Sequence, residues 1–101
     1  MARKCVPLRN EKRQEQVAKL AAKRAELKAI ISSETASFDA KIEARDTLNK
    51  MPRDGSKIRV RNRCSITGRG NGVFKKLMIC RNKFRQMAAN GELPGFTKSS
   101  W

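Results

Sequence analysis

Apolar residues recur at helical spacing over the first third of the chain. The positions that form this stripe are Val17, Leu20, Leu27 and Ile31. Their near-heptad spacing predicts a helix over 11–31 with Asn10 as its N-cap, although Arg24 interrupts the stripe. Because the apolar seam is thin and the other faces are basic, this helix suits docking on a partner better than anchoring a large core.

A second helical pattern follows a polar connection at 32–37. Its recurring positions are Phe38, Ile42, Arg45 and Leu48. Pro52 ends this pattern, because proline has no amide hydrogen to donate and its ring clashes with the preceding turn. The two helices could pair as a helical hairpin or lie separately on another surface, and periodicity does not choose between these arrangements.

Beyond Pro52 the period changes to two. The cations Lys57, Arg59, Arg61 and Arg63 alternate with Ile58, Val60, Asn62 and Cys64. In an extended chain, alternate side chains project to the same side about 6.6 Å apart, at roughly 3.3 Å per residue. We therefore predict a comb of four cations that follows a phosphate backbone. An ordinary amphipathic edge strand with a solvated basic face is the alternative.

Turn residues and a short helix complete the pattern. Asn71–Gly72, directly before Val73–Phe74, predicts a hairpin turn. A helix is then predicted from about Cys80 to Asn90, with Gly91 as its C′ residue. Its inner face is expected to carry Phe84, Met87 and Ala88, and another face Arg81 and Arg85.

The charge balance is strongly basic and uneven. Lys and Arg number 24 against 9 Asp and Glu, giving a net charge of +15. Residues 1–50 carry 12 basic and 7 acidic side chains, whereas residues 51–101 carry 12 basic and 2 acidic ones. Such a density of cations repels itself unless an anionic partner covers it, so the second half predicts a nucleic-acid phosphate backbone as its partner.

Several classes of protein are disfavoured by the same residues. Without His or Tyr, and with Asp54 and Glu92 as the acidic residues of the basic half, the sequence offers no general acid and base pair, so we expect no enzyme and no small-molecule substrate. No apolar run approaches the roughly 20 residues of a membrane span, so we expect no membrane partner. The odd set Cys5, Cys64 and Cys80 suits a reducing compartment.

Two of these cysteines lie at spacings typical of a zinc ribbon with two ligands replaced. The four positions are Cys64, Thr67, Cys80 and Lys83. Two thiolates beside an ammonium bind zinc poorly, so we expect no metal and no cofactor. Apolar contacts of Ile66, Phe74 and Phe84, with hydrogen bonds of Thr67 and Lys83, are expected to hold this knuckle instead. Alternatively, Cys64 and Cys80 are simply two small buried apolar side chains.

These elements predict a mainly α chain with irregular extended segments. N-terminal helices are followed by a degenerate, metal-free zinc-ribbon-like knuckle, a short hairpin and a C-terminal helix. Because Val, Ile, Leu and Phe make up only about a fifth of the residues, we expect a non-globular chain that is ordered by RNA. We divide it into a basic helical extension at 1–51 and an RNA-binding knuckle, helix and tail at 52–101.

Over nearly its whole length the sequence resembles the bacterial-type small-subunit ribosomal protein fourteen family, in its long, zinc-free branch. The motifs that carry the resemblance are Asn62–Cys64 with Thr67–Arg69, Ile79–Arg81 with Phe84–Arg85, the ending Gly91–Trp101, Lys23–Leu27 and Pro52–Asp54. Short zinc-bearing relatives have cysteine at the positions of Thr67 and Lys83. Two departures fall in the turns: Met78 stands where the family usually has glycine, and Gly70–Asn71 replaces a usual proline and its successor.

The resemblance implies a structural constituent of the small ribosomal subunit, bound to 16S-type rRNA in the subunit head. It implies small-subunit proteins three, ten and nineteen as neighbours, support for subunit assembly and for the A-site region, and a cytoplasmic ribosome, with mitochondrial or plastid ribosomes as the alternative. Trp101 is expected to stack on a base or pack in the assembly, or else to lie in a frayed tail. The expected backbone contacts are Lys57, Arg59, Arg61, Arg63, Arg69, Lys75, Lys76, Arg81 and Arg85.

Two rival functions remain open on the residues alone. A DNA-binding zinc-ribbon relative would bind duplex DNA and carry a metal. A membrane-active cationic peptide would need a broad apolar face with bulky aromatics, which the alanine-rich first seam does not supply.

Overall fold

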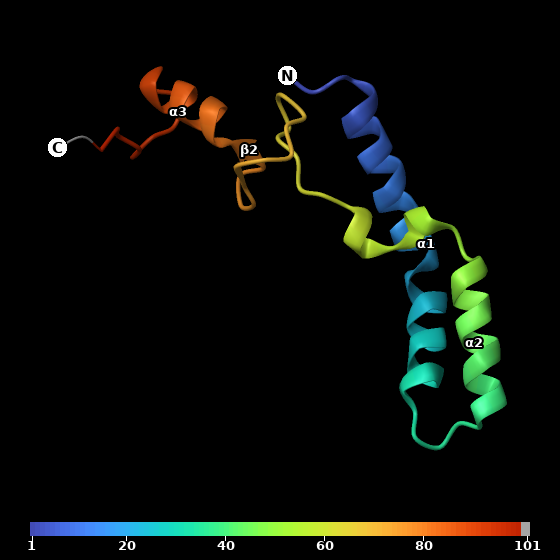
Figure 1. Cartoon of the computed structure of the whole chain (residues 1–101). Helices are drawn as coiled ribbons and strands as arrows, with labels where there is room; N and C mark the ends of the chain where they lie inside the picture. The colour runs from blue at the N-terminus through green and yellow to red at the C-terminus, as the bar shows by residue number, and fades with distance from the viewer. Residues whose placement is uncertain (100–101) are drawn as a thin grey trace. The chain divides into compact units, whose positions relative to one another are not determined.

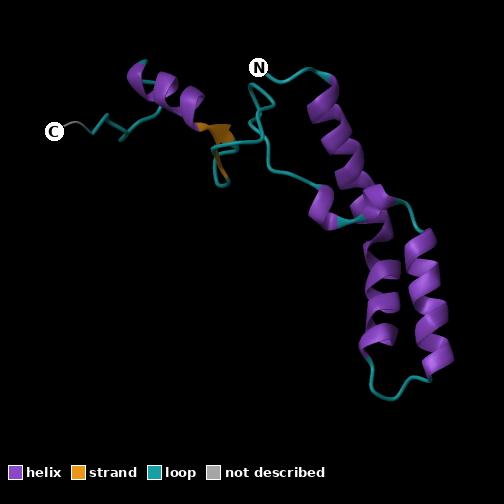
Figure 2. Cartoon of the chain, in the orientation of Figure 1, coloured by secondary structure: helices purple, strands orange, loops and turns teal. Residues whose placement is uncertain are grey.

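The structure is a computed structural model that describes residues 1–99, so the expectation for Trp101 lies outside the described residues. It is mainly helical, with three α-helices and a two-stranded hairpin, which confirms this part of the predicted fold (Figures 1 and 2). One compact unit comprises residues 10–60, and the other contains residues 1–9 and the chain from Arg61 onward. None of the helices in the described part is long and apolar enough to cross a membrane.

Helix α1 covers Cys5–Ser32 and begins earlier than predicted. Pro7 lies in its first turn, where proline is tolerated because the amide there has no intrahelical acceptor. Asn10 is therefore not an N-cap; it lies inside the helix and is buried. The seam of buried and half-buried side chains follows the predicted period but also includes polar residues. Its members are Asn10, Arg13, Val17, Leu20, Arg24, Leu27 and Ile31.

Helix α2 covers Phe38–Lys50 and returns alongside α1, so the two form a helical hairpin (Figure 1). Ser37 caps the helix, because its hydroxyl accepts the Ala40 amide at 3.3 Å. Ala44 is buried, and Arg24 of α1 lines the same hollow as Leu48 of α2. The hairpin alternative left open by periodicity is thus the one adopted.

The chain beyond α2 turns back onto α1 through two 3₁₀-helices, η1 at Arg53–Gly55 and η2 at Lys57–Arg59. Gly55 is buried so closely against α1 that a Cβ there would lie 2.6 Å from Leu20 Cδ1. One carboxylate oxygen of Asp54 accepts from Arg13 Nε at 3.2 Å and from Arg59 Nη1 at 2.6 Å. These ion pairs tie α1 to the segment that follows α2.

Strand β1 at Val73–Phe74 pairs antiparallel with β2 at Ile79–Cys80 (Figure 2). The predicted hairpin is confirmed, but its turn is not at Asn71–Gly72, which precede β1. The connection is residues 75–78, and it closes with the Met78 amide donating to the Phe74 carbonyl at 2.7 Å. Gly72 instead forms a turn before β1, where its φ is 60°. Its carbonyl accepts the Arg81 amide at 2.8 Å.

Helix α3 covers Arg81–Ala89, within one residue of the predicted bounds at each end, and Gly91 is the predicted C′ residue, with a φ of 76°. The amides of Gly91 and Glu92 donate to the carbonyls of Ala88 and Met87, which is the Schellman arrangement that satisfies the last helical carbonyls.

Phe84 of α3 stands between two other rings. The centroid of its ring lies 5.0 Å from that of Phe74 and 5.1 Å from that of Phe96. The contact between Phe74 and Phe84 confirms the predicted apolar pairing, whereas Ile66 is half exposed and Lys83 Nζ donates to Gln86 within its own helix.

Candidate nucleic-acid interface

Cations surround a hollow of about 540 Å³ in the unit that contains the hairpin and α3. The basic side chains that line it are Arg61, Arg63, Arg69 and Lys83. Amide and hydroxyl groups of Thr67, Asn71 and Asn82 add hydrogen-bonding capacity, and no acidic side chain lines the hollow among the described residues. An arrangement of this kind attracts a polyanion and can hydrogen bond to phosphate oxygens.

The predicted comb is only partly present. Residues 57–59 form η2 and are not extended, because their amides and carbonyls close local turns such as the bond from the Val60 amide to the Lys57 carbonyl at 3.2 Å. A period of two therefore cannot place Lys57 and Arg59 in line with Arg61 and Arg63. The hollow keeps the second pair of the comb and adds cations from other segments.

Intramolecular hydrogen bonds hold several of the predicted cations. Arg61 Nη2 donates to the side-chain oxygen of Asn71, and Arg63 Nη1 donates to the Gly68 carbonyl at 3.0 Å. Arg59 is the ion-pair partner of Asp54. These bonds fix the directions of the guanidinium groups of Arg61 and Arg63. The ion pair of Arg59 also stabilises the fold.

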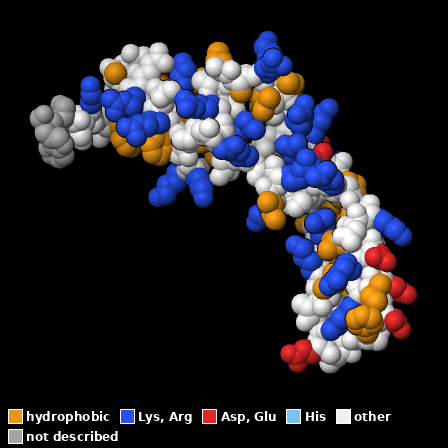
Figure 3. All heavy atoms as spheres, viewed as in Figure 1, with side chains coloured by type: hydrophobic (Ala, Val, Ile, Leu, Met, Phe, Trp, Pro, Cys, Tyr) orange, Lys and Arg blue, Asp and Glu red, His pale blue; other side chains and the backbone are white. Residues whose placement is uncertain are grey.

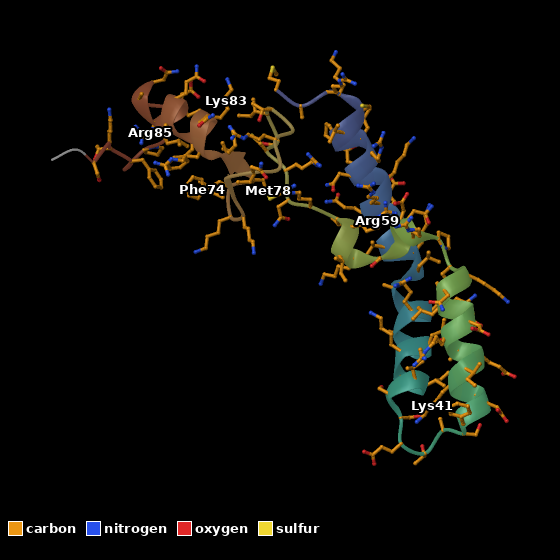
Figure 4. All side chains as sticks on the ribbon, in the orientation of Figure 1. Lys41, Arg59, Phe74, Met78, Lys83 and Arg85 are labelled. Carbon is orange, nitrogen blue, oxygen red and sulfur yellow. The ribbon has the colours of Figure 1, made fainter. Side chains whose placement is uncertain are left out.

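The remaining predicted cations lie on the hairpin loop and on α3. Lys75 and Lys76 are exposed in the connection between β1 and β2. Arg81 and Arg85 lie on the face of α3 that borders a second groove, whereas Lys83 of the same helix lies at the first hollow (Figure 4). The helical period thus divides the cations of α3 between two cavities.

Cys64 and Cys80 are both buried, with exposed fractions of 3% and 2%. The Thr67 hydroxyl lies 3.7 Å from the Cys80 sulfur, within hydrogen-bonding distance for sulfur. Burial acts to raise the pKa of Cys64, but hydrogen bonds from the Thr67 hydroxyl and from the amides of Thr67, Cys80 and Ile66 outweigh it and lower the pKa to about 6. These donors favour a thiolate at neutral pH.

The residues at the four zinc-ribbon spacings do not offer a complete ligand set. In residues 1–99 no three Cys, Asp or Glu side chains gather where they could hold a metal ion. Lys83 Nζ instead donates to Gln86 Oε1 at 3.0 Å. Two sulfurs and a cation nearby therefore do not match the four-ligand chemistry of structural zinc.

Sequence reasoning missed the part played by the first residues of the chain. The Ala2 amide donates to the Thr67 carbonyl at 3.1 Å, and Met1 and Ala2 line the first hollow. Gly68 allows this approach, because its φ is 71° and a Cβ there would lie 3.3 Å from the Ala2 Cβ. Lys83 was likewise assigned only to the knuckle and not to the cationic surface. The contact of Ala2 carries no periodic signal because it joins distant parts of the chain, whereas the helical period could have shown that Lys83 lies on another face than Arg81 and Arg85.

Comparison with known proteins gives a consistent answer over the whole length. Residues 47–100 match the family described as ribosomal protein S14p/S29e. The small ribosomal subunit protein uS14 of Paramagnetospirillum magneticum is 48% identical over 93 residues, which is 92% of either chain. The protein of the same name from Alkalilimnicola ehrlichii is 50% identical over 101 residues and covers both chains completely.

The matched region includes the cations of the basic hollow, the hairpin and α3, and the full-length relatives also span the helical hairpin and the first residues. Their likeness confirms the resemblance found in the motifs and indicates a ribosomal, cytoplasmic location. The chain therefore belongs to the ribosomal protein S14p/S29e family and is a structural constituent of the small ribosomal subunit, not an enzyme.

Proposed function

We propose that the chain binds 16S-type rRNA in the head of the small subunit, and thereby supports subunit assembly, the conformation of the A-site region and translation. The observation that carries this proposal is the hollow of about 540 Å³ lined by Arg61, Arg63, Arg69 and Lys83. Phosphate contacts position a protein on RNA, and the folded shape of the rRNA supplies the selectivity.

The cations differ in how directly they serve this contact. Arg61, Arg69 and Lys83 are assigned to phosphates at the first hollow, and Arg63 is held at its side by the Gly68 carbonyl. The Arg59 guanidinium forms an ion pair with Asp54, so Arg59 is assigned both a structural contact and a phosphate contact. The further proposed contacts are Lys57, Lys75, Lys76, Arg81 and Arg85.

A metal-free knuckle holds this array. In this proposal, hydrogen bonds from the Thr67 hydroxyl and from the amides around Cys64 hold the two cysteines in place of a bound metal. The packed rings of Phe74 and Phe84 stabilise one side of the knuckle. Few apolar side chains are buried among the described residues, namely Ala44, Cys64 and Cys80. A core this small favours a chain whose segment 52–101 becomes fully ordered on rRNA.

The segment 1–51 is proposed as a helical extension that reaches neighbouring proteins, with small-subunit proteins three, ten and nineteen as the candidates. Phe38 is 76% exposed on α2, and Ile42 one turn later is 42% exposed. Acidic side chains gather on this helix, whereas blue cations dominate elsewhere on the same face (Figure 3). The acidic residues on and beside α2 are Glu34, Asp39, Glu43 and Asp46. Because α2 also carries Lys41, Arg45 and Lys50, the helix is near neutral, and together with its exposed apolar side chains it suits a protein surface better than a phosphate backbone.

A salt titration tests rRNA binding. The full chain is titrated with a transcript of the rRNA 3′ major domain at several salt concentrations, and the logarithm of affinity is plotted against the logarithm of salt. Several phosphate contacts give a slope of several units, with about 0.7 to 0.9 unit for each phosphate neutralised. Replacing Arg61, Arg69 and Lys83 together by Ala is expected to reduce the slope by about two units.

A matched triple variant controls for the loss of net charge. Lys12, Lys19 and Lys28 of α1 are exposed and lie outside both cavities lined by α3. Their replacement by Ala removes the same charge and is expected to change the slope less. Equal slopes for the two triple variants would show that the hollow makes no special contact. Equal affinity for duplex DNA would favour the DNA-binding alternative.

Site-specific cross-linking tests the protein contact. A photoreactive amino acid at position 38 of α2, in assembled small subunits, is expected to join this chain to another protein. A predominant cross-link to rRNA from position 38 would refute the assignment of this face to protein. The same substitution at Asn82 of the hollow is the control, for which a cross-link to rRNA is expected.

A further inference from the structure

A second groove of about 540 Å³ lies between α3 and the segment that follows it. Its floor includes the small side chains Ala88 and Ala89, and its rim carries Arg81, Arg85 and Lys98. No acidic residue lines it within the described part of the chain. Both ion pairs recorded for the described residues end at Asp54, so the three rim cations are not neutralised by them.

The wall of the groove is aromatic. Phe96 packs against Phe84 with an angle of 83° between the two rings, and Phe84 packs in turn on Phe74. Phe96 is nevertheless 51% exposed. The ring is therefore supported from one direction and open to a ligand from another, while the side chains of Ala88 and Ala89 leave room beside it.

An exposed aromatic ring beside cations without ion-pair partners among the described residues fits one class of ligand. A nucleotide in a single-stranded segment offers a flat base for stacking and a phosphate on either side of it. Stacking on an exposed aromatic ring is the usual way in which proteins hold unpaired bases, and arginine beside it contacts the backbone. A protein segment would have to supply acidic groups for three cations and an apolar group for the ring.

We infer that this groove is a binding site for one unpaired base of rRNA, with Phe96 as the stacking surface and Arg81, Arg85 and Lys98 on the flanking phosphates. The inference rests on the proposed binding of rRNA and adds a recognition mode that does not depend on charge. Base stacking releases no counterions, so it contributes affinity without changing the salt slope.

Substitutions at Phe96 in the full chain test the site with the 3′ major domain transcript. Phe96→Leu keeps an apolar side chain but removes the ring, and it is expected to weaken binding about fivefold or more, given about 1–3 kcal/mol per stacked base. The salt slope is expected to stay unchanged. Phe96→Tyr keeps the ring and is expected to bind within about twofold of the wild type. Arg85→Ala, by contrast, is expected to lower the slope by about 0.7 to 0.9 unit.

Phe38→Leu is the matched control, because Phe38 is an exposed phenylalanine of α2 that does not line the groove and is assigned to a protein contact, which the transcript does not supply. It is expected to keep wild-type affinity. Ala89→Leu fills the exposed floor on a helix position that tolerates leucine, and it provides a second variant if Phe96→Leu fails to fold. It is also expected to weaken binding without a change of slope.

The outcomes separate this site from rRNA binding as such. Wild-type affinity of Phe96→Leu and Ala89→Leu for the transcript would overturn the base site while leaving rRNA binding intact. If these variants bound RNA normally but dissociated from assembled subunits, the groove would belong to a protein partner, and the inference would again be wrong. Failure of the wild-type chain to bind the transcript would overturn both proposals.

Discussion

The Met78 amide donates to the Phe74 carbonyl at 2.7 Å, and this bond closes the hairpin loop with Met78 at a φ of 52°. The Met78 carbonyl in turn accepts the Ser65 amide at 2.8 Å, which ties the hairpin to the turn after Cys64. A side chain in this left-handed region costs about 1 kcal/mol or more, because Cβ approaches the following carbonyl. The position is the one at which the family resemblance noted a usual glycine.

Replacing Met78 by Gly is therefore expected to stabilise the hairpin relative to Met78→Ala. At an ordinary position glycine is about 0.5–1 kcal/mol less stable than alanine. At Met78 the order should reverse by about 1 kcal/mol, because glycine adopts a positive φ without strain. The comparison with alanine separates backbone strain from the loss of the half-buried methionine side chain.

Hydrogen exchange at the Ser65 amide gives a local measurement, because that amide donates to the Met78 carbonyl. Slower exchange in Met78→Gly than in Met78→Ala is the expected result. Faster exchange in the glycine variant would mean that the left-handed conformation at position 78 stores no strain.

The helices were predictable because their signals are local. Period-3.6 spacing located both long helices, and the seam of α1 follows the predicted positions, Arg24 included, with Asn10 and Arg13 added. The early start of α1 was missed, because Pro7 suggests a break in a sequence although a first turn accepts it. Gly91 ended α3 as expected, since a C′ glycine is defined by its own backbone preference.

The cationic surface was less predictable, because contacts between distant residues shape it. Arg13 and Asp54 are separated by 41 positions, and Asp54 also pairs with Arg59, the last residue of the 3₁₀-helix that replaces the predicted extended segment at 57–59. Ala2 reaches Thr67 across most of the chain. A period of two does not reveal such contacts. The predicted comb therefore wrongly included Lys57 and Arg59, and the first residues of the chain were left out of the interface.

Asp54→Asn is expected to destabilise the helical unit by about 1 kcal/mol. The carboxylate holds both Arg13 and Arg59, but the side chain of Asp54 is 48% exposed, so solvent screening keeps the contribution of each pair modest. The free energy of unfolding in urea, followed by far-ultraviolet circular dichroism, measures this change.

A double-mutant cycle with Arg59→Gln isolates one of the two pairs. The coupling energy between Asp54 and Arg59 is expected to be about 0.5–1 kcal/mol and to fall as salt is raised. Asp46→Asn serves as the control, since Asp46 is an exposed acid of α2 that forms no recorded ion pair among the described residues. A coupling energy of zero at low salt would show that the Asp54–Arg59 contact contributes no stability.

Two substitutions should turn the proposed knuckle into a zinc site. In a tetrahedral zinc centre with zinc–sulfur bonds of about 2.3 Å, neighbouring sulfurs lie about 3.8 Å apart. The Thr67 hydroxyl already lies 3.7 Å from the Cys80 sulfur, and backbone amides already donate to Cys64. The double variant Thr67→Cys with Lys83→Cys is therefore expected to bind one zinc ion per chain.

Metal analysis after purification without chelator, and the absorption spectrum of the cobalt-substituted protein, measure this conversion. The double variant Thr67→Ser with Lys83→Ser, which supplies no further thiolate, is expected to bind far less than one zinc ion per chain, as is the wild type. A zinc-free cysteine double variant that remains folded would contradict the proposed similarity to a zinc ribbon.

The lowered pKa of Cys64 predicts a pH dependence of stability. The folded pKa is about 6 and the ordinary value is 9.0, so between these pH values the unfolded chain binds a proton that the folded chain does not. Stability contributed by the thiolate is therefore present at high pH and is lost as the pH falls through about 6. The free energy of unfolding should rise with pH between these limits by up to about 1.4 kcal/mol per pH unit.

Urea unfolding at several pH values between 6 and 9 measures this slope. The absence of His from the sequence removes the side chain that most often titrates near neutral pH. Cys64→Ser keeps a small polar side chain but does not ionise in this range, so the slope should largely disappear in that variant. Thr67→Val removes the hydroxyl that donates to Cys64, so it should raise the folded pKa and narrow the pH range over which stability changes, while leaving the part due to the backbone amides. An equal slope in the wild type and Cys64→Ser would show that the thiolate is not the group that responds to pH.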